Sequence, residues 1–415
     1  MLSGDLFFAD ESPDSPDLIR LMAPVTSTAA TPFWRDVRVI RVALQIGFVL
    51  ILAAAAAGLY ANLQVNLARR GIELGYGFLG STAGFDIGES FFPYSAGDTY
   101  GQALLVGYVN TVVLAVMGIV FATILGVLAG VARLSSNYLI RQIAAGYVGL
   151  IRNTPLLIQL LFWYFAITLQ LPPVRQAIEL PGPTYVSQRG IYLTWPVPTE
   201  SFAAWVPFLI AAVLAPLAIR WFFRWLQRRT DRPISPWLKL GYLGVPAVLA
   251  IGGFMILPTP PLTLSIPELQ GLNFKDGLRI SPEYAAMLFG LTVYTGAFIA
   301  EVVRAGIQSV SKGQVEAAHA VGLTSGQTLR LVVFPQALRV IIPPLTSQYL
   351  NLAKNTSLAI AVGYPDLFSV AGTVFNQTGT AIEIILLLMV SYLAMSLLTS
   401  FLLNIYNRRV QLVER

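Results

Sequence analysis

Runs of about 20 apolar residues recur along this chain and limit what it can fold into more than any other feature. An apolar helix of about that length crosses the hydrocarbon core of a bilayer. The sequence predicts eight spans, at 40–60, 103–132, 147–170, 202–222, 240–257, 284–304, 340–363 and 381–406. Only 12% of the 415 residues are charged, against about 25% in soluble domains. The expected fold class is therefore an all-α polytopic membrane protein.

The run at 340–363 is unusually polar for a membrane span. Polar side chains at that depth face other helices or a water-filled path rather than lipid. We therefore expect this helix to be enclosed by protein. Its polar residues are candidates for a translocation path or its gate: Gln348, Asn351, Lys354 and Asn355.

Lys354 has two interpretations. It could face the path and meet a substrate carboxylate, since an ionisable group in a span is by default a functional candidate. Alternatively, it could lie near the outer end, reach water or pair with Asp366, and so shape the gate. We favour the structural or gating role.

Lysine and arginine are concentrated in alternate loops, which predicts the orientation of the chain. With the N-terminus inside, the basic residues of the cytosolic segments are Arg133, Arg141, Arg152, the run 220–239, Arg304, Lys312, Arg330, Arg339, Arg408 and Arg409. The opposite loops hold fewer basic residues, diluted by carboxylates. Both termini are thus expected in the cytosol, and the run 220–239 is interpreted as an ordinary cytosolic hairpin.

One cytosolic loop, residues 311–335, contains more helix-capping signals than a simple connector needs. Ser311-x-x-Gln314 and Thr324-x-x-Gln327 both match the capping box, in which side chains satisfy free backbone donors at a helix start. The sequence therefore predicts two short capped helices in this loop.

The same loop is a candidate docking element. Gly322 can end its first helix, and Pro335 is predicted to limit the second. Val315, Ala318 and Gly322 are expected on one face, small enough for a partner to approach closely. Spacing alone supports a solvated helical connector equally well.

The loop resembles the E-A-A-x-x-x-G-(x)9-I-x-L-P signature of permease subunits in ATP-binding-cassette importers. Valine and phenylalanine replace the isoleucine and leucine of that signature. The residues that carry the resemblance are Glu316, Ala317, Ala318, Gly322, Val332, Phe334 and Pro335. In that family, the short helix of the loop enters a cleft on a cytosolic ATPase and transmits its motion to the membrane domain.

Two further blocks, 110–165 and 283–407, are similar to permeases for polar amino acids. The first contains Asn110-Thr111 and Arg152-Asn153-Thr154-Pro155-Leu156, and the second contains Glu301-x-x-Arg304 and Lys354-Asn355-Thr356-Ser357-Leu358. The closest resemblance is to general L-amino-acid and glutamate/glutamine/aspartate systems. We interpret Glu301 and Arg304, three residues apart on one helix face, as an anchor of the docking loop.

The resemblance implies a domain plan in which an importer permease core of five spans carries three extra helices. We expect a cytosolic tail at 1–35, an extra span with an outer loop at 36–100, and the first part of the core at 101–171. An insertion with two extra spans follows at 172–282. The second part of the core is 283–415, with the docking loop at 305–337.

The chain lacks sequences that would let it bind ATP or a metal. It contains no G-x-x-x-x-G-K-[ST] motif, no cysteine and a single histidine. The resemblance therefore implies a transport subunit that is not an enzyme and binds no cofactor or metal itself, with ATP-Mg on a separate cytosolic ATPase dimer. It also implies a second homologous permease, an extracytoplasmic amino-acid-binding protein, surrounding lipid and a bacterial inner membrane.

A different class of function remains open from the residues alone. An autonomous secondary transporter or channel for a small polar solute would use Lys354, Asn351 and Gln348 as its site and would need no ATPase. Many such folds contain inverted repeats, and no convincing repeat is present in this sequence.

Overall fold

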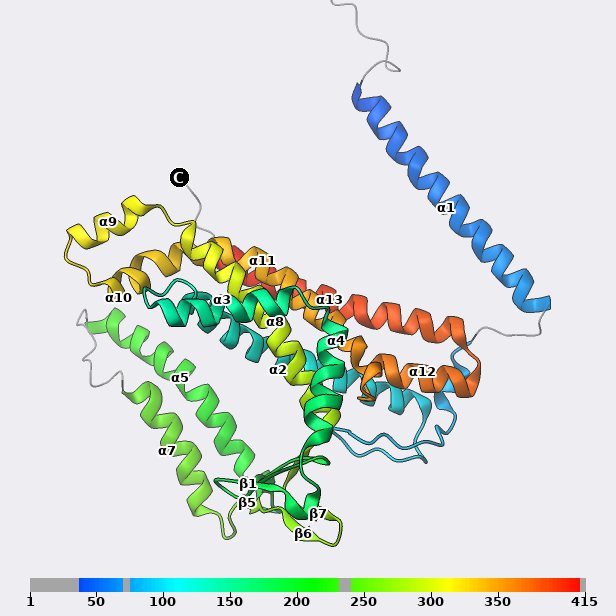
Figure 1. The fold of residues 1–415 in the computed structure, drawn as a ribbon, viewed down its shortest axis with the longest axis horizontal. Coiled ribbons are helices and arrows are strands. Elements are labelled where there is room, and N and C mark those ends of the chain that lie inside the picture. The colour runs from blue at the N-terminus through cyan, green and yellow to red at the C-terminus, as the bar shows by residue number, and fades with distance from the viewer. Residues whose placement is uncertain (1–36, 70–74, 231–239, 411–415) are drawn as a thin grey trace, which may run out of the picture. The chain divides into compact units, whose positions relative to one another are not determined.

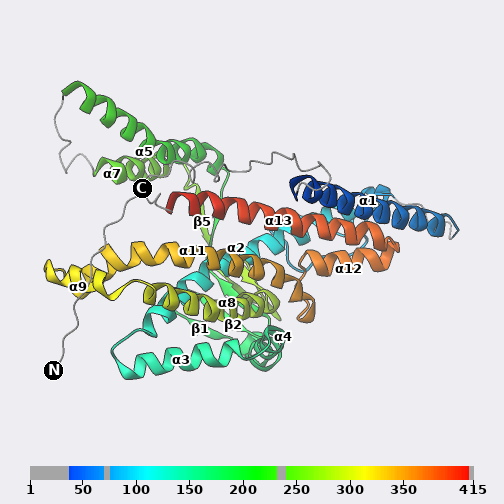
Figure 2. The same cartoon turned by 90° about the horizontal axis from the view of Figure 1, so that it is seen from above.

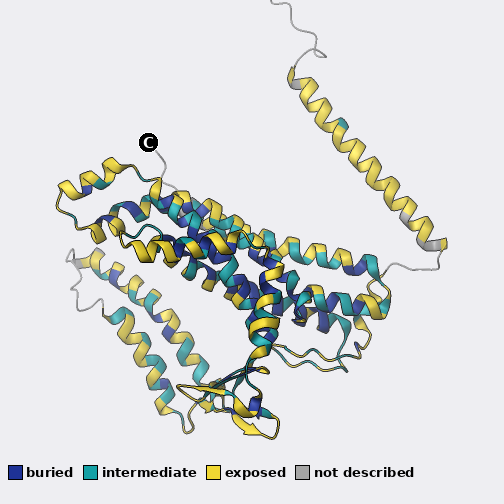
Figure 3. Ribbon diagram, viewed as in Figure 1, coloured by how far each residue is buried: buried dark blue, intermediate teal, exposed yellow. Residues whose placement is uncertain are grey.

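The computed structural model describes residues 37–69, 75–230 and 240–410, which belong to two units, Met1–Leu74 and Gly75–Arg415. The expected tail at 1–35 lies outside the described residues. In the first unit, α1 (Val37–Arg69) contains an apolar stretch, Val39–Asn66, long enough to cross a membrane. Its described side chains are almost all exposed (Figure 3), as expected of a helix whose apolar surface is stabilised by lipid.

The predicted all-α class is confirmed, while the count of eight spans is not. Among the described residues, six helices are long and apolar enough to cross a membrane, or seven if one bent pair counts as a span. The remaining predicted span, 240–257, is the shorter apolar helix α7 (Gly241–Ile256). The long helices of the second unit are α2 (Tyr100–Ala132), α5 (Phe202–Thr230), α8 (Pro282–Gln308), α11 (Phe334–Asn355) and α13 (Ala381–Val410).

The span predicted at 147–170 is not one straight helix, because the chain bends there by 106°. Helix α3 (Tyr138–Arg152) ends before Asn153-Thr154-Pro155, and α4 (Leu156–Leu161) begins after it. Proline lacks the N–H of an α-helical turn and disfavours helical backbone in the residue before it. The Gln159 side chain donates to the Ile151 and Thr154 carbonyls at 2.9 Å each, which satisfies backbone acceptors at the break.

After α4, the chain continues through a π-helical segment, Phe162–Ile167, and two short 3₁₀ turns, Thr168–Gln170 and Val174–Gln176. Another 3₁₀ turn, Gly77–Gly80, lies before α2, and one follows α11 at Thr356–Ala361. Helix α12 (Leu367–Thr378) lies between that turn and α13.

The centre of the second unit is the packed pair α2 and α8, which lie side by side in Figures 1 and 2. A Cβ added at Gly126 would lie 2.5 Å from Ile299, and one added at Gly130 would lie 2.8 Å from the Ala300 carbonyl. Glycine at both positions therefore allows the two backbones to approach closely. The darkest, most buried residues of Figure 3 gather in this bundle.

A buried polar network joins α2 to the segment before α12. Asn110 donates to the Glu89 and Pro365 carbonyls, and Tyr364 donates to the Asn110 carbonyl. The Thr111 hydroxyl accepts from the backbone of Leu367 at 2.9 Å. Buried polar groups are stable when paired in this way, so the network fixes the connection between α11 and α12 against α2.

The segment 172–282 forms a hairpin of α5 and α7 together with eight short strands. The strands gather at one end of the hairpin (Figure 1) and form three antiparallel sheets with orders β1-β2-β3-β8, β4-β5 and β6-β7. Their bounds are β1 Ile178–Leu180, β2 Thr184–Ser187, β3 Gly190–Leu193, β4 Trp195–Pro198, β5 Leu262–Ser265, β6 Glu268–Gln270, β7 Asn273–Lys275 and β8 Leu278–Ile280. The insertion predicted at 172–282 therefore contains a small β unit with its own buried residues, Val174, Tyr192 and Phe274.

Candidate functional site

The predicted docking loop is helical and projects beyond the ends of α8 and α11 (Figures 1 and 2). It contains α9 (Lys312–Ala320), α10 (Ser325–Thr328) and a π-helical turn, Leu329–Val333, that runs directly into α11. The two helices predicted from the caps are confirmed, although the second is a single turn.

Gly322 ends α9 as predicted. Its φ of +85° lies in the left-handed region that favours glycine. The Gly322 amide donates to the His319 carbonyl at 2.9 Å, and the Leu323 amide donates to the Ala318 carbonyl at 3.1 Å. This pair of bonds is the Schellman arrangement, which satisfies two carbonyls at the helix end.

The outer face of α9 differs from the predicted one. Ala318 is only 5% exposed and Val315 is half-buried, so these two side chains pack inside the loop. On α9 and at its C-terminal end, the exposed residues of the signature are Glu316, Ala317 and Gly322. A partner that reaches α9 would therefore meet the surface formed by these three residues.

One of the two predicted capping boxes forms. Thr324 accepts from the Gln327 amide, and the Gln327 side chain accepts from the Thr324 amide at 2.9 Å. The Ser311 box is wrong, because Ser311 makes no side-chain cap bond. Gln314 instead accepts from the Gln336 side chain at 3.3 Å and joins the two ends of the loop.

Pro335 does not stop the second helix, contrary to the sequence-based prediction. It lies in the first turn of α11, where a missing N–H costs little, and the π turn immediately before it widens the helix. Of the signature residues in this part of the loop, Val332 is half-buried and Pro335 is exposed.

The two helices at the base of the loop are closely packed, because Gly306 on α8 lies against Ile341 on α11.

Glu301 and Arg304 pair as their spacing predicts, within a larger cluster. The Glu301 carboxylate accepts from Arg304 and from Arg133, which directly follows α2. An Arg152 guanidinium nitrogen lies 3.8 Å from the same carboxylate. These are the ion pairs found among the described residues. The sequence did not identify Arg133 and Arg152 as partners of Glu301, because each lies more than 140 positions from it along the chain.

The polar residues of α11 are only partly enclosed. Asn351 and Lys354 are exposed on this chain, together with Ser347, one turn earlier on the same side. Gln348 and Asn355 are half-buried. The spacing of 347, 351 and 354 makes a polar stripe along one helix face. Because lipid does not solvate such groups, this face needs a protein or water on it.

The alternative pairing of Lys354 with Asp366 is wrong. Asp366 is fully buried; it caps α12 by accepting from the Ser369 amide at 2.9 Å, and it accepts from the Tyr392 hydroxyl at 3.2 Å. Burial raises the pKa of this carboxyl, which lies between the last two spans, to about 6.

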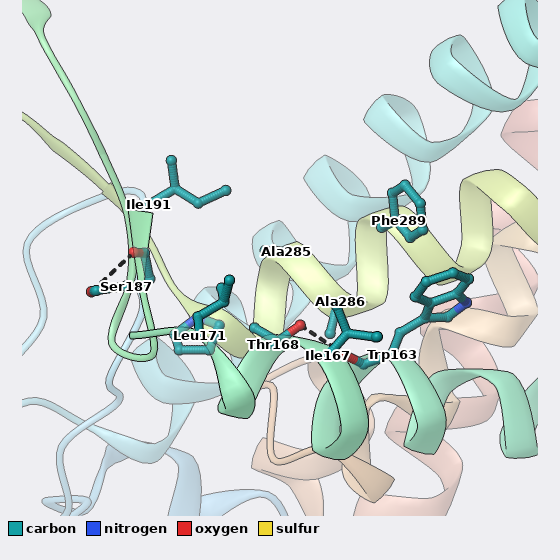
Figure 4. A pocket seen from close by; sticks show the side chains of 11 residues that line it. Trp163, Ile167, Thr168, Leu171, Ser187, Ile191, Ala285, Ala286 and Phe289 are labelled. Atoms are coloured by element: carbon teal, nitrogen blue, oxygen red, sulfur yellow. Dashed lines mark hydrogen bonds between the residues drawn. The ribbon is translucent and has the colours of Figure 1, made fainter. Parts of the chain in front are cut away.

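An apolar cavity of about 270 Å³ lies where the π-helical segment passes α8 (Figure 4). Trp163 and Phe289 line one end of it and Ile191 the other. Its two hydroxyls already donate to backbone carbonyls, Thr168 to Trp163 and Ser187 to Gly190. Because no charged side chain lines it, this cavity does not suit the ammonium and carboxylate of an amino acid.

A second cavity, of about 380 Å³, is polar. Asp86 and Glu89 line it from the segment before α2, Arg279 lines it from β8, and Glu283 lines it from the start of α8. Glu89 accepts from the Ser281 hydroxyl, and burial raises the pKa of its carboxyl. No sequence motif marked this cavity, because its charged residues come from segments about 190 positions apart.

Comparisons with known proteins identify the family of this chain and several similar proteins. Residues 224–412 match the family described as "Binding-protein-dependent transport system inner membrane component". The chain is 46% identical to the permease protein YhdX of Escherichia coli K12 over 86% of this chain and 90% of that protein. It is 44% identical to the general L-amino acid transport system permease protein AapQ of Rhizobium johnstonii, over 85% and 88% of the two chains. It is also 37% identical to the glutamate/glutamine/aspartate/asparagine transport system permease protein BztB of Rhodobacter capsulatus, over 92% and 96%.

Proposed function

The chain belongs to the permeases of binding-protein-dependent amino-acid ABC transporters, and from this premise we propose how its surfaces serve import across the inner membrane. Its cargo is L-amino acids, as the names of AapQ and BztB indicate for those two proteins. The chain itself acts as a transport subunit. ATP-Mg is bound and hydrolysed by a separate pair of cytosolic ATPase subunits.

The docking loop is the contact to the ATPase. The single observation that supports this most is the form of α9, a short helix closed by Gly322 and standing out from the bundle with Glu316 and Ala317 exposed. Its base is tied by the packing of Gly306 against Ile341, so a push on α9 moves α8 and α11 together. A rigid, protruding helix transmits displacement better than a flexible connector.

The polar stripe of α11 faces a second permease. Ser347, Asn351 and Lys354 are exposed in a helix that crosses the membrane, where lipid would leave their polar groups unpaired. A homologous subunit that covers this face would enclose a polar path between the two permeases. Within that path, Lys354 acts at the gate, and Gln348 and Asn355 support it from the partly buried side of the helix.

The opposite side of the membrane receives the substrate. An extracytoplasmic binding protein delivers the amino acid to the face formed by the β unit and the polar cavity around Glu89 and Arg279. That face carries charged groups of both signs, which suits a hydrated protein contact better than a lipid contact.

A mild-detergent pull-down of the tagged chain from native membranes tests the assembly. We expect three kinds of protein in the eluate, identified by mass spectrometry: an ATPase with a phosphate-binding loop, a second permease and an amino-acid-binding protein. Recovery of the chain alone, from an extract in which the ATPase is present, would contradict the proposal.

A further inference from the structure

The cluster around Glu301 joins three helices at the end of the bundle from which the docking loop projects. Glu301 lies on α8, two turns before that helix ends, Arg133 follows the last residue of α2, and Arg152 is the last residue of α3. Arg304, on α8 itself, also donates to Gln308. One carboxylate is therefore shared by three guanidinium groups, and its loss would leave like charges facing each other.

The three arginines differ in how closely they contact Glu301 and in how exposed their side chains are. Arg133 and Arg304 hydrogen-bond to Glu301, and their side chains are 21% and 27% exposed. Arg152 lies 3.8 Å from the carboxylate, and its side chain is 40% exposed. The Arg152 guanidinium also lies 5.2 Å from the centre of the Phe298 ring, one turn earlier on α8. Arg152 thus makes the longest and most solvated contact of the cluster.

The helices next to these arginines also pack against α8 to different extents. Helix α2 is locked to α8 by the close approach at Gly126 and Gly130. Helix α3 packs on α8 less extensively, in part through the Tyr147 hydroxyl, which donates to the Val293 carbonyl at 2.7 Å. Its C-terminal end borders the 106° bend before α4. At that end, the ionic contact between α3 and α8 is made by Arg152.

We propose that Arg152 is a positioning residue that couples the docking loop to the bend between α3 and α4. Motion of α9 passes to α8, which carries both Glu301 and Phe298, and these two residues hold or release Arg152. The α3–α4 bend then shifts while the α2–α8 pair stays intact. This inference rests on the proposed docking of an ATPase, and it assigns the route by which that motion reaches the membrane helices.

The test uses the complete reconstituted importer with Arg152→Ala, Arg152→Lys and Arg141→Ala. Arg141 is the matched control, since it lies on the same helix and contacts Ser135 and Tyr138 but not Glu301. Two quantities are measured: ATPase copurified per permease, and amino acid imported per ATP hydrolysed. We expect Arg152→Ala to assemble normally and to import about fivefold less per ATP, the factor that corresponds to the ~1 kcal/mol upper value for a partly exposed ion pair. Arg152→Lys should recover most of this ratio, and Arg141→Ala should not change it.

Unchanged import per ATP in Arg152→Ala would overturn the proposal, as would an equal loss in Arg141→Ala. If Arg152→Ala fails to bind the ATPase, its role is structural and the proposal is also overturned. Phe298→Leu provides an independent variant: it removes the ring and leaves the charges, and a smaller loss of import per ATP is expected. Failure of the wild-type chain to capture an ATPase would instead contradict the proposed function.

Discussion

Substitution of Gly322 separates the fold of the docking loop from its contact with the ATPase. At a φ of +85°, any L-amino acid with a Cβ bears strain of about 1–2 kcal/mol, and asparagine bears less than most. Nothing lies within 4 Å of a Cβ built at this position, and Gly322 is exposed, so a larger side chain can leave the backbone there without a clash at its Cβ. Gly322→Asn and Gly322→Trp should therefore both leave the membrane fold intact and yield similar amounts of purified permease.

The two variants should differ once the ATPase binds. Forcing a bulky side chain into a close contact typically costs about 1–3 kcal/mol, which corresponds to roughly 5- to 150-fold weaker binding. For Gly322→Trp, we expect ATPase capture and ATP-driven uptake to decrease by a factor in this range. For Gly322→Asn, both should stay near the wild-type level. Gly326→Trp is the control for bulk, since that glycine is also open but lies on α10. Wild-type uptake by a well-assembled Gly322→Trp complex would refute the reasoning.

Three further predictions concern the membrane helices and the segment between the last two of them. Gly126→Val should destabilise the α2–α8 pair by about 1–3 kcal/mol, because its side chain would overlap Ile299, and a lower thermal midpoint in detergent would show this. Because burial raises the pKa of Asp366 from 3.8 to about 6, its contribution to stability is fully present below about pH 4 and is lost as pH rises from there through 6. Asp366→Asn should remove this slope from the pH dependence of the midpoint, and an unchanged slope would count against it. Lys354→Gln should slow uptake of acidic and neutral amino acids equally if Lys354 acts at the gate, whereas a loss confined to acidic substrates would indicate direct contact.

Local signals in the sequence predicted the docking loop well. Gly322 correctly predicted the end of α9, because a left-handed backbone conformation depends mainly on which residue occupies that one position. The Thr324 cap also formed, whereas Ser311 did not cap because its partner Gln314 bonds across the loop to Gln336. Burial of Ala318 depends on how the loop folds back on itself, which the helical spacing alone does not specify.

Longer-range features could not be read from the sequence. Hydropathy over 147–170 is continuous, so the break at Asn153-Thr154-Pro155 was hidden by apolar neighbours. The three arginines around Glu301 meet only when α2, α3 and α8 are packed together. The β unit escaped prediction because its strands have only three or four residues, too few to establish a period.

The docking of an ATPase on α9 can be tested directly by cysteine cross-linking, because the chain contains no native cysteine. Ala317→Cys places a thiol on the exposed face of α9, and Thr328→Cys places one at a buried site in the same loop as the control. With a bifunctional thiol reagent and the complete importer, we expect Ala317→Cys to link to the ATPase and Thr328→Cys not to do so. Equal linking at both sites, or none at Ala317→Cys in a complex that still imports amino acids, would contradict this account.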